Sequence, residues 1–136
     1  MNRNIKLSLT IIFVLYTGFV MAKTLWRGEI MPLKKVCSKW GESQFEISKF
    51  KSGSETIRAQ MACSLIKNEK LFFGKDRSEI RSSLGTYDGF YFTDMFPAYM
   101  IQSGKSHEED SWQIVFFLDN KEKIKEIAVH KNCCDN

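Results

Sequence analysis

Cysteine and histidine offer this sequence its widest chemical options, and two cysteines stand side by side near its end. The stretch "HKNCC" holds His130, Cys133 and Cys134, and the whole chain has four cysteines and two histidines. The other two cysteines are Cys37 and Cys63. Zinc ligation, thiol–disulfide exchange and structural disulfides are the three kinds of chemistry open to such a set.

Residue spacing distinguishes these possibilities. Zinc sites favour ligands two to four residues apart with a second pair elsewhere, and His107 lies in an acidic stretch remote from Cys37. Redox sites favour Cys-x-x-Cys at a helix N-terminus, whereas Cys133 and Cys134 are adjacent. A bond between adjacent cysteines departs from preferred disulfide geometry. We therefore expect two long-range structural disulfides, with a thiol–disulfide or metal-binding protein as the outlying alternative.

The pairing expected for these cysteines depends on strand parity. If the last strand continues to the C-terminus, Cys133 and Cys134 face opposite sides of the sheet and each needs a distant partner. We favour Cys63–Cys133 and Cys37–Cys134 over the swapped pairing. Each bond closes a long loop and contributes roughly 2–4 kcal/mol by restricting the unfolded chain.

Catalytic residue sets do not emerge from the residue types and their spacing. A Ser-His-Asp or Cys-His set must use one of the two histidines, and neither stands in such a pattern. Glu108, Glu109 and Asp110 are typical of a solvated loop, 103–110, and "GKDRSE" lacks the further glycines of a phosphate-binding loop. We expect no enzyme, no cofactor and no metal.

The N-terminus has the pattern of a secretory signal peptide. Arg3 and Lys6 form a basic start, residues 7–21 are almost wholly apolar, and a Val-x-Ala pattern ends at Ala22. The apolar run falls short of the roughly 20 residues that a membrane span needs, although an N-terminal anchor remains the alternative. No cysteine follows Ala22 to accept a lipid. We expect cleavage there and a periplasmic or secreted protein without a transmembrane span.

Charge and composition describe one ordinary domain. Loss of the signal peptide lowers the formal net charge from +4 to +2, and the basic residues are scattered rather than interleaved with aromatics. This pattern gives no support to nucleic-acid binding. Residues 23–136 have the length of a single domain, and no repeat or linker divides them.

Local patterns predict two helices. Residues 23–51 read as an N-terminal arm, in which 43–51 is a short strand or irregular. Ser54 can cap a helix over 54–68, where apolar residues recur at helical spacing. Asp76 and Glu79 form a capping-box pattern for a helix over 77–84, which Gly85 ends.

After these helices the apolar period changes to two. Strands are predicted over 89–94, 97–102, 111–119 and 123–130, with a turn at 95–97 and a final hairpin. The predicted fold is α+β: two helices packed on one face of an antiparallel sheet of three to four strands.

The stretch "FFGKDRSEIRSSLGTYDG" resembles the signature of the BamE (SmpA/OmlA) family, and "SWQIVFFLDNKEKIKEIAV" is similar to that family's closing hairpin. The resemblance covers about half of the mature chain. It departs from the family at Tyr87, where proline is usual, in the missing lipid-bearing cysteine, and in its four cysteines. It implies a divergent envelope accessory protein with a fold related to β-lactamase inhibitors.

Aromatic residues cluster in "YDGFYFTDMFPAYM", and they carry our expectation of a binding surface. If Phe90 packs inward, Tyr91 faces outward, and after the turn Tyr99 does the same, with Phe96 near the turn. Exposed aromatics of this kind anchor protein partners. The alternative is that the arm covers this sheet face through Trp26 and Trp40.

These expectations describe a small exported protein that works by binding another protein, without enzymatic activity. The resemblance implies an envelope accessory component. A periplasmic inhibitor or immunity protein, acting against an exported enzyme or toxin, is the alternative.

Overall fold

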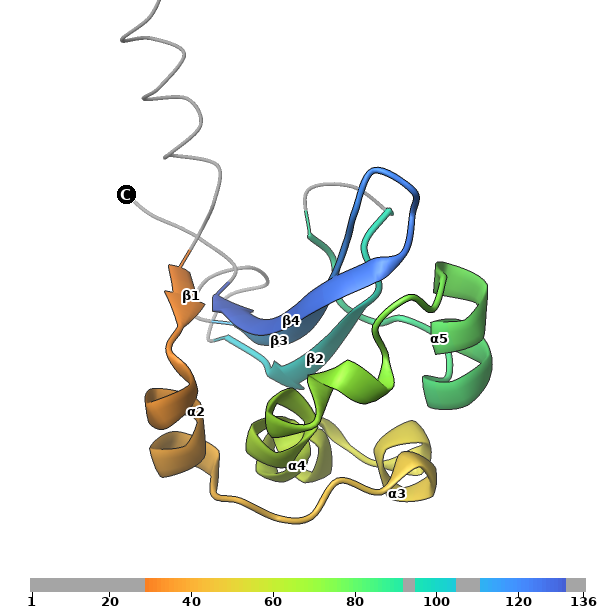
Figure 1. Cartoon of the computed structure of the whole chain (residues 1–136). Coiled ribbons are helices and arrows are strands. Elements are labelled where there is room, and N and C mark those ends of the chain that lie inside the picture. Colours follow the sequence, from red (N-terminus) through yellow and green to blue (C-terminus); the bar gives the residue numbers. More distant parts are fainter. Residues whose placement is uncertain (1–28, 92–94, 105–110, 132–136) are drawn as a thin grey trace, which may run out of the picture.

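A computed structural model describes residues 29–91, 95–104 and 111–131 (Figure 1). They form a four-stranded antiparallel sheet with helices on one face, the α+β fold that the sequence predicts. In chain order the elements are β1 Glu29–Met31, α2 Leu33–Trp40, α3 Ile47–Ser52, α4 Glu55–Lys67, the 3₁₀ turn η1 Glu69–Leu71, α5 Arg77–Leu84, β2 Ala98–Gln102, β3 Trp112–Leu118 and β4 Ile124–Lys131.

The sheet has the strand order β1-β4-β3-β2, so β1 and β2 are its edges. The β3–β4 hairpin places Ile114 opposite Val129 and Phe116 opposite Ile127. These four side chains are buried in the core, on the sheet face that the helices cover. Their alternation with residues of the other face gives the period of two that is visible in the sequence.

Helix α4 packs across the sheet and supplies much of the core. The Ser54 hydroxyl accepts a hydrogen bond from the Ile57 N–H, as expected of an N-cap. Met61 and Leu65 are almost fully buried, and so are Ala59 and Ala62. The helix predicted over 54–68 is confirmed as Glu55–Lys67.

Helix α5 is confirmed over its predicted range, Arg77–Leu84. Asp76 accepts from the Glu79 N–H, and the Glu79 carboxylate accepts from the Asp76 N–H, which completes the capping box. Gly85 ends the helix with φ +92°, a conformation that side chains disfavour. Ile80 and Leu84 bury the apolar ridge of this helix.

The N-terminal arm differs from its prediction. Residues 33–40 form helix α2, and helix α3 over 47–52 overlaps most of the segment 43–51 that was expected to be a strand or irregular. Each of these short helices buries one residue, Val36 in α2 and Phe50 in α3. In α3 a single buried residue produces no apolar period, so the sequence could not reveal that helix. In α2, by contrast, Leu33, Val36, Cys37 and Trp40 recur at helical spacing, and Cys37 and Trp40 pack against the core with Val36, so this helix was predictable from the sequence and was missed.

The expected strand over 89–94 is also absent from the described residues. Tyr91 forms an isolated bridge, and 92–94 lie outside the described residues. The chain here crosses the edge of the sheet at Gly89, whose N–H donates to the Ala98 carbonyl at 3.0 Å. The three longer strands agree with prediction to within two residues at each end, and β1 was not predicted.

The favoured cysteine pairing is wrong. Cys37 on α2 is bonded to Cys63 on α4, with Cα atoms 4.9 Å apart, so neither can pair with Cys133 or Cys134. The reason is that residues 33–40 are helical and pack on α4, which brings the two cysteines of different helices together. Cys133 and Cys134 lie outside the described residues.

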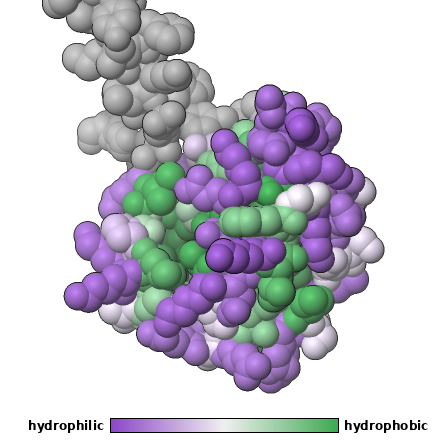
Figure 2. All heavy atoms as spheres, viewed as in Figure 1, coloured by the Kyte–Doolittle hydropathy of each residue, from purple (hydrophilic) through white to green (hydrophobic). Residues whose placement is uncertain are grey.

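Other predictions also concern residues that the structure does not describe. These are the signal peptide over 1–22 with its cleavage at Ala22, Trp26, and most of the loop 103–110, including His107. Within the described ranges, no helix has both the length and the apolar character needed to cross a membrane. In the view of Figure 2, polar side chains cover much of the surface, and apolar side chains show between them near its middle.

Candidate binding groove

The sheet face away from the helices carries an aromatic cluster. Tyr91 packs edge-on against Phe96, Phe117 and His130, with ring centroids 5.5, 5.1 and 4.6 Å away. His130 is 3% exposed, while the three aromatic residues are half-buried. The cluster therefore covers the outer face of β3 and β4 with side chains from the segment that precedes β2.

The residues before this cluster wrap around the β2 edge, and we call 88–90 the clasp. On the helix side, the Asp88 carboxylate accepts from the Met100 N–H at 2.9 Å. On the outer face, the Gln113 side chain accepts from the Phe90 N–H at 2.9 Å and donates to the Phe90 carbonyl at 2.6 Å. Together with Gly89, these bonds tie the clasp to two strands.

Gly89 is needed where the clasp crosses the edge. A Cβ atom there would lie 2.6 Å from the Gln113 Oε1 and 3.0 Å from the Ala98 carbonyl carbon. Such separations are shorter than van der Waals contact. Residue 89 must therefore lack a side chain for the chain to pass this close to the sheet edge. The crossing at Gly89 places Phe90 on the outer face of the sheet.

Tyr99 is not at the surface, contrary to the sequence prediction. It is 1% exposed, packs edge-on against Phe50 and Phe116 with centroids 5.3 and 5.9 Å away, and donates its hydroxyl to the Gly85 carbonyl at 2.9 Å. Burial raises the pKa of Tyr99 well above its usual value. Tyr91 lies on the opposite face of the sheet from Tyr99. The two residues therefore do not share a face, as two regular strands joined by a turn would have required.

Phe90 replaces Tyr99 as the exposed aromatic residue. The sequence had suggested Phe90 as an inward residue, yet it is 57% exposed. The exposed Met95 and the half-buried Phe96 follow in the same segment. Trp40 does not cover the outer face; it packs edge-on against Trp112 in the core, with centroids 5.9 Å apart.

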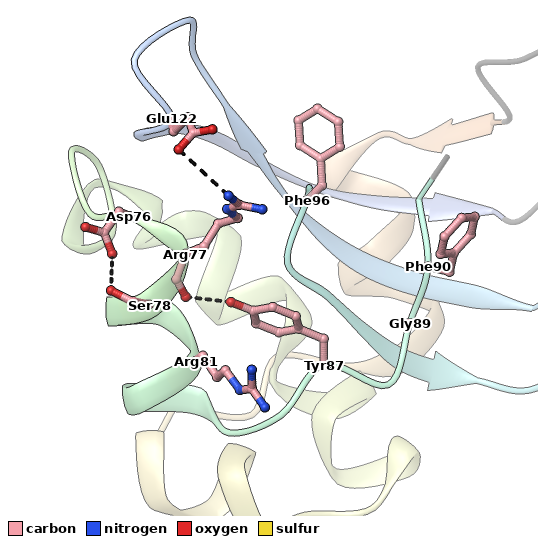
Figure 3. A pocket seen from close by; sticks show the side chains of 9 residues that line it. All are labelled: Asp76, Arg77, Ser78, Arg81, Tyr87, Gly89, Phe90, Phe96 and Glu122. Carbon is pink, nitrogen blue, oxygen red and sulfur yellow. Dashed lines mark hydrogen bonds and ion pairs between the residues drawn. The ribbon is translucent and has the colours of Figure 1, made fainter. Parts of the chain in front are cut away.

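An open groove of about 650 Å³ separates α5 from the clasp (Figure 3). Arg77 and Arg81 come from α5, while Phe90 and Phe96 come from the opposite side, with Tyr87 between them. Its remaining lining residues are Asp76, Ser78, Gly89 and Glu122. The α5 side of the groove thus carries two arginines next to two carboxylates, and the opposite side carries two aromatic residues.

Tyr87 is anchored at the base of the groove. Its hydroxyl donates to the Arg77 carbonyl at 2.5 Å, and its ring packs edge-on on Tyr99 with centroids 5.7 Å apart. Burial raises the pKa of Tyr87 above its ordinary value, at which a phenol is already protonated at neutral pH, so the hydroxyl remains a donor in this bond. Core packing therefore fixes the floor of the groove.

The acidic residues of the groove differ from one another. Asp76 caps α5, and hydrogen bonds from Ser78 and from the Glu79 N–H lower the pKa of this exposed carboxyl to about 2, with Lys123 3.3 Å away. Glu122 extends from the β3–β4 turn to 3.8 Å from Arg77. The Asp76 carboxylate is therefore already hydrogen-bonded within the protein, whereas Glu122 makes only a long ion pair with Arg77.

Metal-ligating residues meet at one place in the described part of the chain: Cys37, Glu42 and Cys63. The two sulfur atoms are bonded to each other, and Glu42 forms an ion pair with Lys67. A disulfide offers no thiolate to a metal. His130, which the sequence had placed with Cys133 and Cys134 as possible ligands, belongs to the aromatic cluster.

Two of the aromatic residues that the sequence predicted for a binding surface lie at or beside this groove. Phe96 and Tyr91 were predicted as surface aromatics, and they lie in the groove and in the adjoining cluster. Arg77 and Arg81 were missed, although their spacing of four on a predicted helix places them on one side of it. Only the wrapping of the chain at Gly89 brings the aromatic wall opposite them.

Comparison of the chain with protein-family models, with curated proteins and with solved structures finds no match. The resemblance to the BamE family thus stays an expectation from the quoted motifs.

Proposed function

We propose that this chain is a non-enzymatic protein-binding module that acts through the groove beside α5. The observation that carries the proposal is Phe90, whose side chain is 57% exposed on the rim of the groove, across from Arg77 and Arg81. Exposed aromatic and arginine residues are enriched among the anchors of protein interfaces. The clasp supports such a role because its hydrogen bonds hold Phe90 in place before a partner arrives.

We also propose export to the periplasm or beyond. The signal-peptide pattern over 1–22 supports this, and the Cys37–Cys63 bond is of the kind that persists in oxidising compartments. Together with the BamE-like motifs, this favours a role as an accessory component of the bacterial envelope. The lack of a lipid-accepting cysteine after Ala22 supports the second candidate, a soluble inhibitor or immunity protein.

Site-directed photo-cross-linking tests the proposed function. The full chain would carry a benzophenone amino acid in place of Phe90, in its native host, and adducts would be identified by mass spectrometry. A matched control carries the same group in place of Leu33, which is 37% exposed on α2, at the other end of the sheet.

We expect a protein adduct from position 90 that is missing from position 33. An envelope component in the adduct favours the accessory role, and an enzyme or toxin whose activity falls on binding favours the inhibitor. Equal adduct patterns at the two positions would contradict binding at this groove.

A further inference from the structure

The two walls of the groove have a regular spacing. Arg77 and Arg81 are four residues apart on α5, so Arg81 follows Arg77 by about 6 Å along the helix axis. Figure 3 shows Arg77 toward the Phe96 end and Arg81 beside the Tyr87 ring. The Cα atoms of these two arginines are thus about one helical turn apart along one wall of the groove.

An extended peptide has a matching repeat. Its alternate side chains point to one side and are about 6.6 Å apart, while the residue between them points to the other side. A strand lying along the groove would direct side chains i and i+2 to Arg77 and Arg81. Its residue i+1 would then face Phe90 and Phe96.

The charges of the groove select the chemistry of those side chains. Arg81 makes no ion pair with any described residue, and the Arg77–Glu122 pair is 3.8 Å long between side chains 39% and 61% exposed. Exposed pairs of this kind contribute little, so a better-placed carboxylate can displace Glu122. Carboxylates bind guanidinium groups through paired hydrogen bonds.

We propose that the groove binds an extended peptide in which acidic and apolar residues alternate. This inference rests on the proposed function and names the class of partner segment. The acidic side chains bind Arg77 and Arg81, and the apolar side chain between or after them packs on Phe90 and Phe96. The peptide backbone lies over Tyr87.

Fluorescence anisotropy with defined peptides tests the inference. The probe is a fluorescein-labelled peptide of sequence Gly-Asp-Leu-Glu-Phe-Gly, and the control peptide Gly-Asp-Glu-Leu-Phe-Gly has the same composition without alternation. We expect the alternating peptide to bind more tightly than the control, and binding to weaken as salt is raised.

Two variants with opposite expected effects test the contacts. Arg81→Glu should weaken binding of the alternating peptide at least about tenfold, the loss typical of an interface anchor. Glu122→Gln should strengthen binding, because it removes the competitor for Arg77. Lys34→Glu, an equal charge change at an exposed position of α2, should leave the affinity unchanged.

Three results would overturn the inference: equal affinity for the two peptides, equal weakening by Arg81→Glu and Lys34→Glu, or no effect of Glu122→Gln. Thermal melts of each variant verify that it is folded. If the position-90 cross-link finds a partner but the wild-type chain binds neither peptide, the proposed function stands and the acidic-peptide inference is wrong. If a peptide binds but no protein adduct forms, the proposed function is wrong instead.

Discussion

Arg58 and Asp88, which are 30 residues apart in the sequence, face each other through two hydrogen bonds of 2.8 and 2.7 Å. The same carboxylate accepts from the Met100 N–H. Asp88 therefore joins α4 to the edge of β2 and starts the clasp. The Arg58 side chain is only 13% exposed, so loss of its partner would leave a mostly buried charge uncompensated.

Asp88→Asn should make stability less sensitive to acid. Burial raises the pKa of Asp88, but hydrogen bonds from Arg58 and from the Met100 N–H together outweigh it and leave the pKa below its ordinary value. The unfolded chain then takes up the proton first, so this stabilisation is present above about pH 4 and is lost as pH falls through the folded pKa. Thermal melts between about pH 5 and pH 3 should show a smaller decline for the variant than for the wild type.

Glu126→Gln, at an exposed position of β4, is the matched control for that measurement and should follow the wild-type decline. An Asp88→Asn decline as steep as that of the wild type would show that the Arg58–Asp88 pair does not contribute to acid sensitivity.

Gly89→Ala should loosen the clasp. The added methyl group meets the Ala98 backbone and the buried Gln113 side chain, so we expect a cost of about 1–3 kcal/mol, as for overpacking in a core. Urea unfolding measures this cost. Gly74→Ala is the informative comparison, because a Cβ at Gly74 meets no atom within 4 Å and the residue is strained only through its φ of +79°. Faster amide exchange of Phe90 in the Gly89 variant would locate the effect in the clasp.

The Cys37–Cys63 bond should contribute about 2–4 kcal/mol to stability through restriction of the unfolded chain. Urea unfolding of the Cys37→Ser/Cys63→Ser double variant, compared with the wild type, checks the magnitude. Peptide mapping without reductant should recover Cys37 linked to Cys63. Recovery of either residue linked to Cys133 or Cys134 would contradict the structure.

Tyr99 substitutions should separate its hydroxyl from its ring. Tyr99→Phe removes the hydrogen bond to the Gly85 carbonyl and should cost about 1 kcal/mol. Tyr99→Ala removes a ring packed against Phe50 and Phe116 and should cost about 3–5 kcal/mol. Unfolding free energies from urea titration measure both. A Tyr99→Ala protein as stable as the wild type would mean that Tyr99 is at the surface, as the sequence alone had suggested.

The two predicted helices, α4 and α5, could be read from the sequence because their capping residues and apolar spacing are local patterns. Ser54, and Asp76 with Glu79, cap helices through bonds that span three residues. The β3–β4 hairpin has an equally local period. These features depend on neighbours along the chain, and the sequence displays such neighbours directly.

The binding site could not be read in the same way. The prediction for Tyr99 assumed two regular strands joined by a turn, so that Tyr91 and Tyr99 would share a face. The chain instead wraps the β2 edge at Gly89, which places Tyr91 on the outer face and Tyr99 in the core. The disulfide was missed for a related reason, because it depends on how α2 packs against α4.

The positions of the bonded cysteines in the chain bear on how the disulfide forms during synthesis. Cys37 and Cys63 are 26 residues apart, and both leave the ribosome, or any channel that the chain threads N-terminus first, well before the two C-terminal cysteines. For that interval, the chain holds no competing thiol. Vectorial emergence thus favours the native bond. When that bond forms before the C-terminal cysteines emerge, they no longer find Cys37 or Cys63 as a free thiol in the same chain.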